Sequence, residues 1–186
     1  MDALTEVGRI LGSLQGIWDE EAVDELDHAL QAAARAQEDG ADDELVLAAA
    51  LHDLGHSPLL GGPHIAAHER IAKDWLTERF GERVGWLAGA HVAAKRYLAA
   101  TDPDYRLSDT SMTSLHHQGG AGIDPETVAH PWFADALRLR RYDDAAKDPQ
   151  GRGLSVDEVL TIAERVVANR LCVEHRCAEH GAGPAR

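Results

Sequence analysis

Nearly the whole chain repeats its apolar residues at helical spacing, and this periodicity constrains the fold more than any other feature. Between residues 20 and 39, apolar side chains recur every three or four positions, which predicts an amphipathic helix. The same reasoning predicts helices at about 43–53, 66–80, 82–100, 108–119, 131–146 and one that opens at the capping box Ser155-Val156-Asp157-Glu158. No segment shows a convincing strand-like alternation. We therefore expect an all-α fold of about seven helices.

The length and composition of the chain favour one folded domain. Its 186 residues are long enough to bury a core, and 44% of them are apolar. We expect residues 1–178 to form this domain. Residues 179–186 contain two glycines and a proline, so we expect them to be a disordered tail.

The charge balance and the cysteine content exclude several classes of partner and setting. With 18 basic and 32 acidic residues, the net charge is −14, which disfavours nucleic acid and anionic membranes as partners. The longest apolar run, residues 45–51, is far shorter than the roughly 20 residues of a membrane span. Two cysteines cannot form a disulfide framework. These features predict a cytoplasmic protein.

Histidine is unusually frequent, with eleven in the chain, and several histidines fall at helix positions that could converge. The pair His52-Asp53 ends a helix rich in alanine and leucine, where both side chains can turn toward one cavity. Imidazole and carboxylate together suit Fe, Mn, Zn or Ni. A single buried histidine is more often simply hydrogen-bonded. Across five predicted helices, however, the order is His28, His52-Asp53, His68, His91 and then Asp143 or Asp144.

This order resembles the HD-domain superfamily of helical metalloproteins over roughly residues 20 to 147. The resemblance implies a single HD-type bundle with a dinuclear metal site in its core. Asp53 would bridge the two metals, and the six implied ligands are His28, His52, Asp53, His68, His91 and Asp144. The loop before His68 is short for the family, so His64 remains a rival of His68.

Four further runs resemble one branch of the superfamily, the PhnZ-like organophosphonate oxygenases, which are related to myo-inositol oxygenase. The runs are HVAAKRYL (91–98), HDLGH (52–56), SMTSLHHQGG (111–120) and RYDDAAK (141–147). The resemblance implies substrate contacts from His56, Lys95, Ser114, Gln118 and Arg141. Lys95 lies one helical turn after His91, so it would face the same cavity. We expect Arg138 and Arg140 to belong to a solvated helix face.

The chain departs from this branch just before the first histidine helix. Members with a lid at the metal site carry Tyr and then Glu three residues later, whereas this chain has Trp18 and Glu21. An indole has no phenolic oxygen with which to ligate iron. Trp18 could instead stack on a cationic substrate tail, with Glu21 beside it, or it could simply pack.

The resemblance implies an O2-dependent oxidation of a small 1-hydroxyalkylphosphonate that cleaves the C–P bond and releases phosphate. Its cofactors would be two iron ions, Fe(II) and Fe(III), with O2 as co-substrate. Three alternatives remain open. They are an HD-type phosphohydrolase that uses a metal-activated water, a diiron oxygenase of another small anionic hydroxylated substrate, and a helical metal-binding regulator without catalysis.

Overall fold

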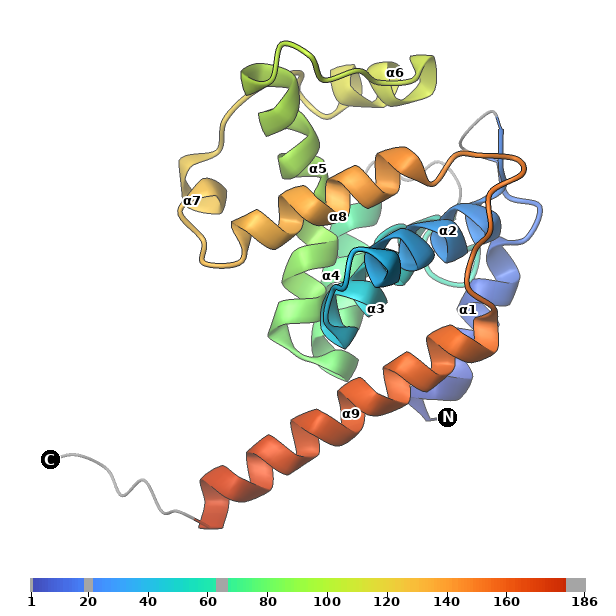
Figure 1. The fold of residues 1–186 in the computed structure, drawn as a ribbon, viewed down its shortest axis with the longest axis vertical. Helices are drawn as coiled ribbons and strands as arrows, with labels where there is room; N and C mark the ends of the chain where they lie inside the picture. Colours follow the sequence, from blue (N-terminus) through green and yellow to red (C-terminus); the bar gives the residue numbers. More distant parts are fainter. Residues whose placement is uncertain (1, 19–21, 63–66, 180–186) are drawn as a thin grey trace, which may run out of the picture.

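The computed structural model describes residues 2–18, 22–62 and 67–179, and all secondary structure in these ranges is helical (Figure 1). The all-α prediction is therefore confirmed. The helices of the described part are α1 (Ala3–Leu14), α2 (Glu25–Glu38), α3 (Asp43–Leu51), the 3-10 helix η1 (Leu54–His56), α4 (His68–Phe80), α5 (Glu82–Thr101), α6 (Asp109–His117), α7 (Pro125–Val128), α8 (Phe133–Ala145) and α9 (Val156–Glu179).

The expected number of about seven helices is too low because α1 and two short helices were missed. The signal for α1 was present in the sequence. Its buried residues Val7, Ile10, Leu11 and Leu14 have helical spacing, and the side chain of Asp2 accepts a hydrogen bond from the backbone N–H of Thr5. An apolar stripe behind such an N-cap is typical of an amphipathic helix.

Helix α3 occupies the centre of the molecule, where α2, α5, α8 and α9 pack around it (Figure 1). Every residue from Leu45 to Leu51 is buried. A helix that is apolar on all sides is stable only when it is covered on all sides. Helix α3 is therefore packed inside the protein, and His52 and Asp53, which follow it directly, lie in the interior.

Helix α6 lies at the edge of the fold, away from the packed centre (Figure 1). It buries only two of its residues, Ser111 and Leu115, while Met112 is exposed. Ser108 caps α6 as expected, because its side chain accepts from the N–H of Ser111. A helix with so little buried apolar surface depends on polar contacts for its position.

Helix α9 begins at the predicted capping box and runs along the outside of the body (Figure 1). The N–H of Ser155 donates to Glu158 Oε2 at 2.7 Å, and the N–H of Glu158 donates to Ser155 Oγ at 3.2 Å. Val159, Ile162 and Val166 bury one face of this helix. None of the described helices has the length and apolar character that crossing a membrane requires.

Candidate metal centre

Four buried or half-buried histidines from four different segments meet at the end of α3. His28 comes from α2, His52 follows α3, His68 begins α4 and His91 lies within α5. They form two pairs through their Nε2 atoms, which are 3.4 Å apart in His28 and His52 and 3.2 Å apart in His68 and His91. The structure thus brings together the four histidines that the sequence singled out.

The carboxylate of Asp53 lies between the two histidine pairs. Its Oδ2 is 3.0 Å from His52 Nε2 and 3.6 Å from His28 Nε2. Its Oδ1 is 3.3 Å from His68 Nε2 and 3.4 Å from His91 Nε2. Each oxygen therefore faces one pair, which is the arrangement that a bridging carboxylate needs.

The other ring nitrogen of three of these histidines faces a backbone carbonyl oxygen. The Nδ1 atoms of His28, His52 and His91 lie 3.0, 2.8 and 2.6 Å from the carbonyl oxygens of Ala146, Ala49 and Ala88. Since a carbonyl only accepts, each Nδ1 carries the proton, and in a neutral ring the Nε2 lone pair is then directed at the centre.

The charge balance of this centre tests whether its residues fit a metal. Although burial opposes it, the carboxylates of Asp53 and Asp143 raise the pKa of His28 and His52, so protons on these two rings compensate the carboxylates. A divalent cation would take the place of these protons, and metal-ligating histidines typically donate their other N–H to a carbonyl or a carboxylate. The donor set of histidine and aspartate around His28 and His52 therefore fits a divalent metal.

Two ionised carboxylates lie in this buried centre. Burial alone would raise the pKa of Asp53 and of Asp143, but the charge of His52 beside Asp53 and of Arg140 beside Asp143 holds both pKa values well below their usual range. Burial lowers the pKa of His91 to about 3, so its imidazole stays neutral. Buried carboxylates are stable only when cations compensate them.

The carboxylate of α8 that faces the histidines belongs to Asp143. Asp143 Oδ1 is 3.5 Å from His28 Nε2, and Asp143 Oδ2 is 3.6 Å from His52 Nε2. Asp144 instead accepts from Arg140 and, at 2.6 Å, from the hydroxyl of Tyr105. In the structure the carboxylate beside the histidines is therefore that of Asp143, one position before the expected Asp144. One residue is about 100° around a helix, which is enough to turn a side chain away.

The same one-residue difference affects the arginines. Arg141 was expected to face the site, yet its side chain is 62% exposed and its Nη2 lies 3.7 Å from Asp102 Oδ2. Arg140 was expected on a solvated face, yet it is 3% exposed and bonds to Asp143 and Asp144. Both expectations are corrected, because α8 turns Arg140 and Asp143 inward together.

A buried lysine lies one turn along α5 from His91. Lys95 is 4% exposed, and its Nζ donates to Ser114 Oγ at 2.8 Å, so the structure brings these two residues together. Burial, and next the nearby charge of Arg140, lowers the pKa of Lys95 to about 8. Lys147, to which the sequence analysis gave no role, donates to Ser111 Oγ at 2.8 Å. Two hydroxyls of α6 thus face two lysines.

His56 and Gln118 each carry a buried polar atom that has no hydrogen-bond partner within the described ranges. These atoms are His56 Nδ1 and Gln118 Oε1. His56 is 5% exposed and its ring stacks on His68 with 4.4 Å between centroids. Its ring also lies close enough to Asp53 and His68 to serve as a metal ligand. Both residues therefore retain a polar atom for a ligand.

The remaining sequence-predicted residues precede α2 and α4. Glu21 and His64 lie outside the described residues. Trp18 is 60% exposed, so its side chain is not part of the buried core. Its role in specificity stays a prediction.

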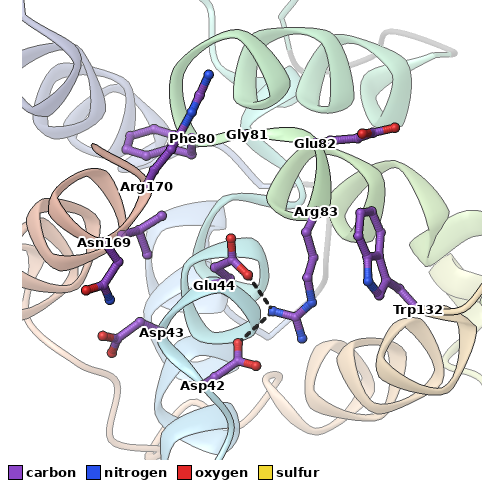
Figure 2. A pocket seen from close by; sticks show the side chains of 11 residues that line it. Asp42, Asp43, Glu44, Phe80, Gly81, Glu82, Arg83, Trp132, Asn169 and Arg170 are labelled. Atoms are coloured by element: carbon purple, nitrogen blue, oxygen red, sulfur yellow. Dashed lines mark hydrogen bonds and ion pairs between the residues drawn. The ribbon is translucent and has the colours of Figure 1, made fainter. Parts of the chain in front are cut away.

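A separate cavity of about 710 Å³ lies between the start of α3, the α4–α5 turn and α9 (Figure 2). Its lining is rich in carboxylates, and Arg83 bonds to two of them, Asp42 at 2.8 Å and Glu44 at 2.9 Å. None of the sequence-predicted site residues lines it. This cavity is therefore separate from the histidine centre.

Comparison with known proteins identifies relatives of this chain by sequence. No family model matches the chain. It is 36% identical over 170 residues to the hydroxymethylphosphonate dioxygenase of Gimesia maris, which covers 84% of this chain and 81% of that protein. It is 34% identical over 160 residues to the [1-hydroxy-2-(trimethylamino)ethyl]phosphonate dioxygenase (glycine-betaine-forming) of Leisingera caerulea, with 75% and 81% covered. An uncharacterised protein of Acanthamoeba polyphaga mimivirus is 36% identical over 140 residues, which span 68% of this chain and 64% of that protein.

Proposed function

The chain belongs to the family of phosphonate dioxygenases, and from this premise we propose that it oxidises a small 1-hydroxyalkylphosphonate with O2. The C–P bond breaks, phosphate leaves and the carbinol carbon becomes a carboxylic acid. One O2 balances this reaction, because both of its oxygen atoms enter the products. The enzyme is thus an oxidoreductase that acts on phosphonates.

The cofactor of this proposal is a pair of iron ions, Fe(II) and Fe(III), held by the centre at the end of α3. His28, His52 and Asp143 would hold one ion, His68 and His91 the other, and Asp53 both. The observation that carries the proposal is Asp53, whose two oxygens each face one pair of Nε2 atoms. When bound, such metals polarise substrate oxygens and supply the redox chemistry for O2.

Lys95 is the group best placed to bind the phosphonate. Its buried ammonium donates to Ser114 within a site that also contains the ionised Asp53 and Asp143. A charge-assisted hydrogen bond to a phosphonate oxygen is stronger than the bond to a neutral hydroxyl that it would replace. His56 and Gln118 would use their unpartnered atoms to orient the substrate.

The protein itself contributes binding, orientation and exclusion of water. His56 and Lys95 lie among buried residues, so a phosphonate held there loses most of its contact with solvent. In such surroundings charged hydrogen bonds are stronger than in water. Trp18, exposed before α2, is proposed to select the substituent of the substrate, including a cationic tail.

The decisive experiment assays protein loaded with Fe(II) under anaerobic conditions. Hydroxymethylphosphonate, 1-hydroxy-2-(trimethylamino)ethylphosphonate and a phosphomonoester are each tested with and without O2. We expect O2 consumption and phosphate release in equal amounts from a hydroxyphosphonate only. Release from the phosphomonoester without O2 would establish the phosphohydrolase instead.

The number of metals is tested separately by metal analysis and Mössbauer spectroscopy of the loaded protein. Two irons per chain are expected. One iron per chain, unchanged when His91 is replaced by alanine, would contradict a dinuclear centre.

A further inference from the structure

Arg140 is a buried cation whose side chain is held on three sides. Its Nη1 donates to Asp143, its Nη2 donates to Asp144, and its Nε lies 2.9 Å from the hydroxyl oxygen of Tyr105. The Nε is also 3.2 Å from Asp144 Oδ2. A guanidinium has N–H donors in a fixed planar fork, so these contacts fix its orientation as well as its place.

Tyr105 closes this arrangement from the segment that joins α5 to α6. Its hydroxyl donates to Asp144 Oδ2 at 2.6 Å while it accepts from Arg140. Burial raises the pKa of Tyr105, so the phenol keeps its proton and can act as this donor. Asp144 and Tyr105 therefore occupy the Nε and Nη2 side of the guanidinium, while Nη1 bonds to Asp143.

The carboxylate of Asp143 lies between the guanidinium of Arg140 and the pair His28 and His52. Arginine and a carboxylate readily form two parallel hydrogen bonds when nothing else competes. Asp144 is such a competitor, because it occupies Nη2 and shares Nε. Without it, Arg140 would be free to take both oxygens of Asp143 and turn them away from His28 and His52.

We propose that Asp144 and Tyr105 are positioning residues that act through Arg140 to keep Asp143 oriented toward the histidines as a metal ligand. The inference rests on the proposed metal centre in one respect, since it assumes that a metal binds beside Asp143. In this proposal Arg140 orients the carboxylates of Asp143 and Asp144 and does not bind the substrate. The geometry supports this because Arg140 is 3% exposed and its contacts are with protein carboxylates and a phenol.

The test is anaerobic titration of the metal-free full-length protein with Fe(II), with bound metal counted and its affinity measured for each equivalent. The variants are Asp144→Asn and Tyr105→Phe. Their matched controls are Asp74→Asn, on the exposed face of α4, and Tyr97→Phe, whose ring packs edge-on against Phe133. Thermal unfolding of each metal-free variant checks its fold.

Asp144→Asn is expected to lower the affinity for one equivalent of Fe(II) by about 10- to 100-fold and to leave the affinity for the other unchanged. Loss of a hydrogen bond to a metal ligand typically has an effect of this size. Tyr105→Phe should lower the affinity for the same equivalent by a smaller factor. If Asp144→Asn does not fold, the affinity of Tyr105→Phe tests the inference. The controls should match the wild type.

Two results would overturn the inference. One is wild-type affinity for both equivalents in both variants. The other is a raised KM for the phosphonate at unchanged metal affinity, which would place the network at the substrate. A wild-type protein that binds only one iron, still weakened in both variants, would refute the dinuclear centre and leave the positioning role standing.

Discussion

Replacement of Lys95 by methionine should stabilise the substrate-free protein. Burial, reinforced by the charge of Arg140, lowers the pKa of Lys95 from 10.5 to about 8, which corresponds to about 3 kcal/mol of folding free energy at neutral pH. The variant loses the hydrogen bond to Ser114, worth about 1 kcal/mol. A net gain of about 2 kcal/mol in the free energy of unfolding is therefore expected at pH 7.

The sign of this effect follows from which state binds the proton more tightly. The folded pKa of Lys95 lies below its value in the unfolded chain, so the penalty is complete below about pH 8. It shrinks as the pH rises from about 8 to 10.5, where the unfolded chain also loses the proton. The advantage of the methionine variant should disappear over this range.

The same substitution should weaken substrate binding. Loss of a charge-assisted hydrogen bond costs about 1.5–3 kcal/mol, so the KM for the phosphonate should rise roughly 10- to 100-fold. In the wild type the KM should also rise above about pH 8, as Lys95 loses its proton. The variant should lack this rise.

The assay combines thermal unfolding of the metal-free protein at pH 7 and pH 10 with O2 consumption by the iron-loaded protein. Lys73→Met, on the exposed face of α4, is the control and should change neither quantity. A Lys95→Met protein that unfolds at a lower temperature at pH 7 and no longer binds iron would refute the reasoning. Lys95 would then support the fold rather than bind the anion.

Three further substitutions test other parts of the site. Asp53→Asn should remove both irons in metal analysis, because the two oxygens of Asp53 face both histidine pairs; retention of one iron would contradict bridging. Arg141→Ala should change the KM for the phosphonate by less than about twofold, since an exposed side chain makes only a weak ion pair, whereas a tenfold rise would restore the sequence-based assignment. Trp18→Leu should weaken the binding of a trimethylammonium substrate by about 0.5–2 kcal/mol and leave the binding of hydroxymethylphosphonate unchanged. Equal effects on both substrates would show that Trp18 does not stack on a cationic tail.

The sequence by itself determined most of the longer helices and brought most residues of the histidine centre into view. Apolar spacing and N-caps are local properties, so the core helix α3 and the capped start of α9 could be predicted from residues close together in the chain. His52 and Asp53 end that core helix, which made an interior site predictable. Periodicity also carried the signal for α1, which was overlooked.

Only the tertiary structure decided which side chains of α8 face the centre. Asp143 and Asp144 are the same residue type at adjacent positions, and Arg140 and Arg141 are as well, so the sequence pattern fits either pair. Packing of α8 against α2 and α5 turns Arg140 and Asp143 inward and leaves Arg141 exposed. The choice depends on the rotation of a helix about its axis, about 100° for each residue, and contacts with distant parts of the chain set that rotation.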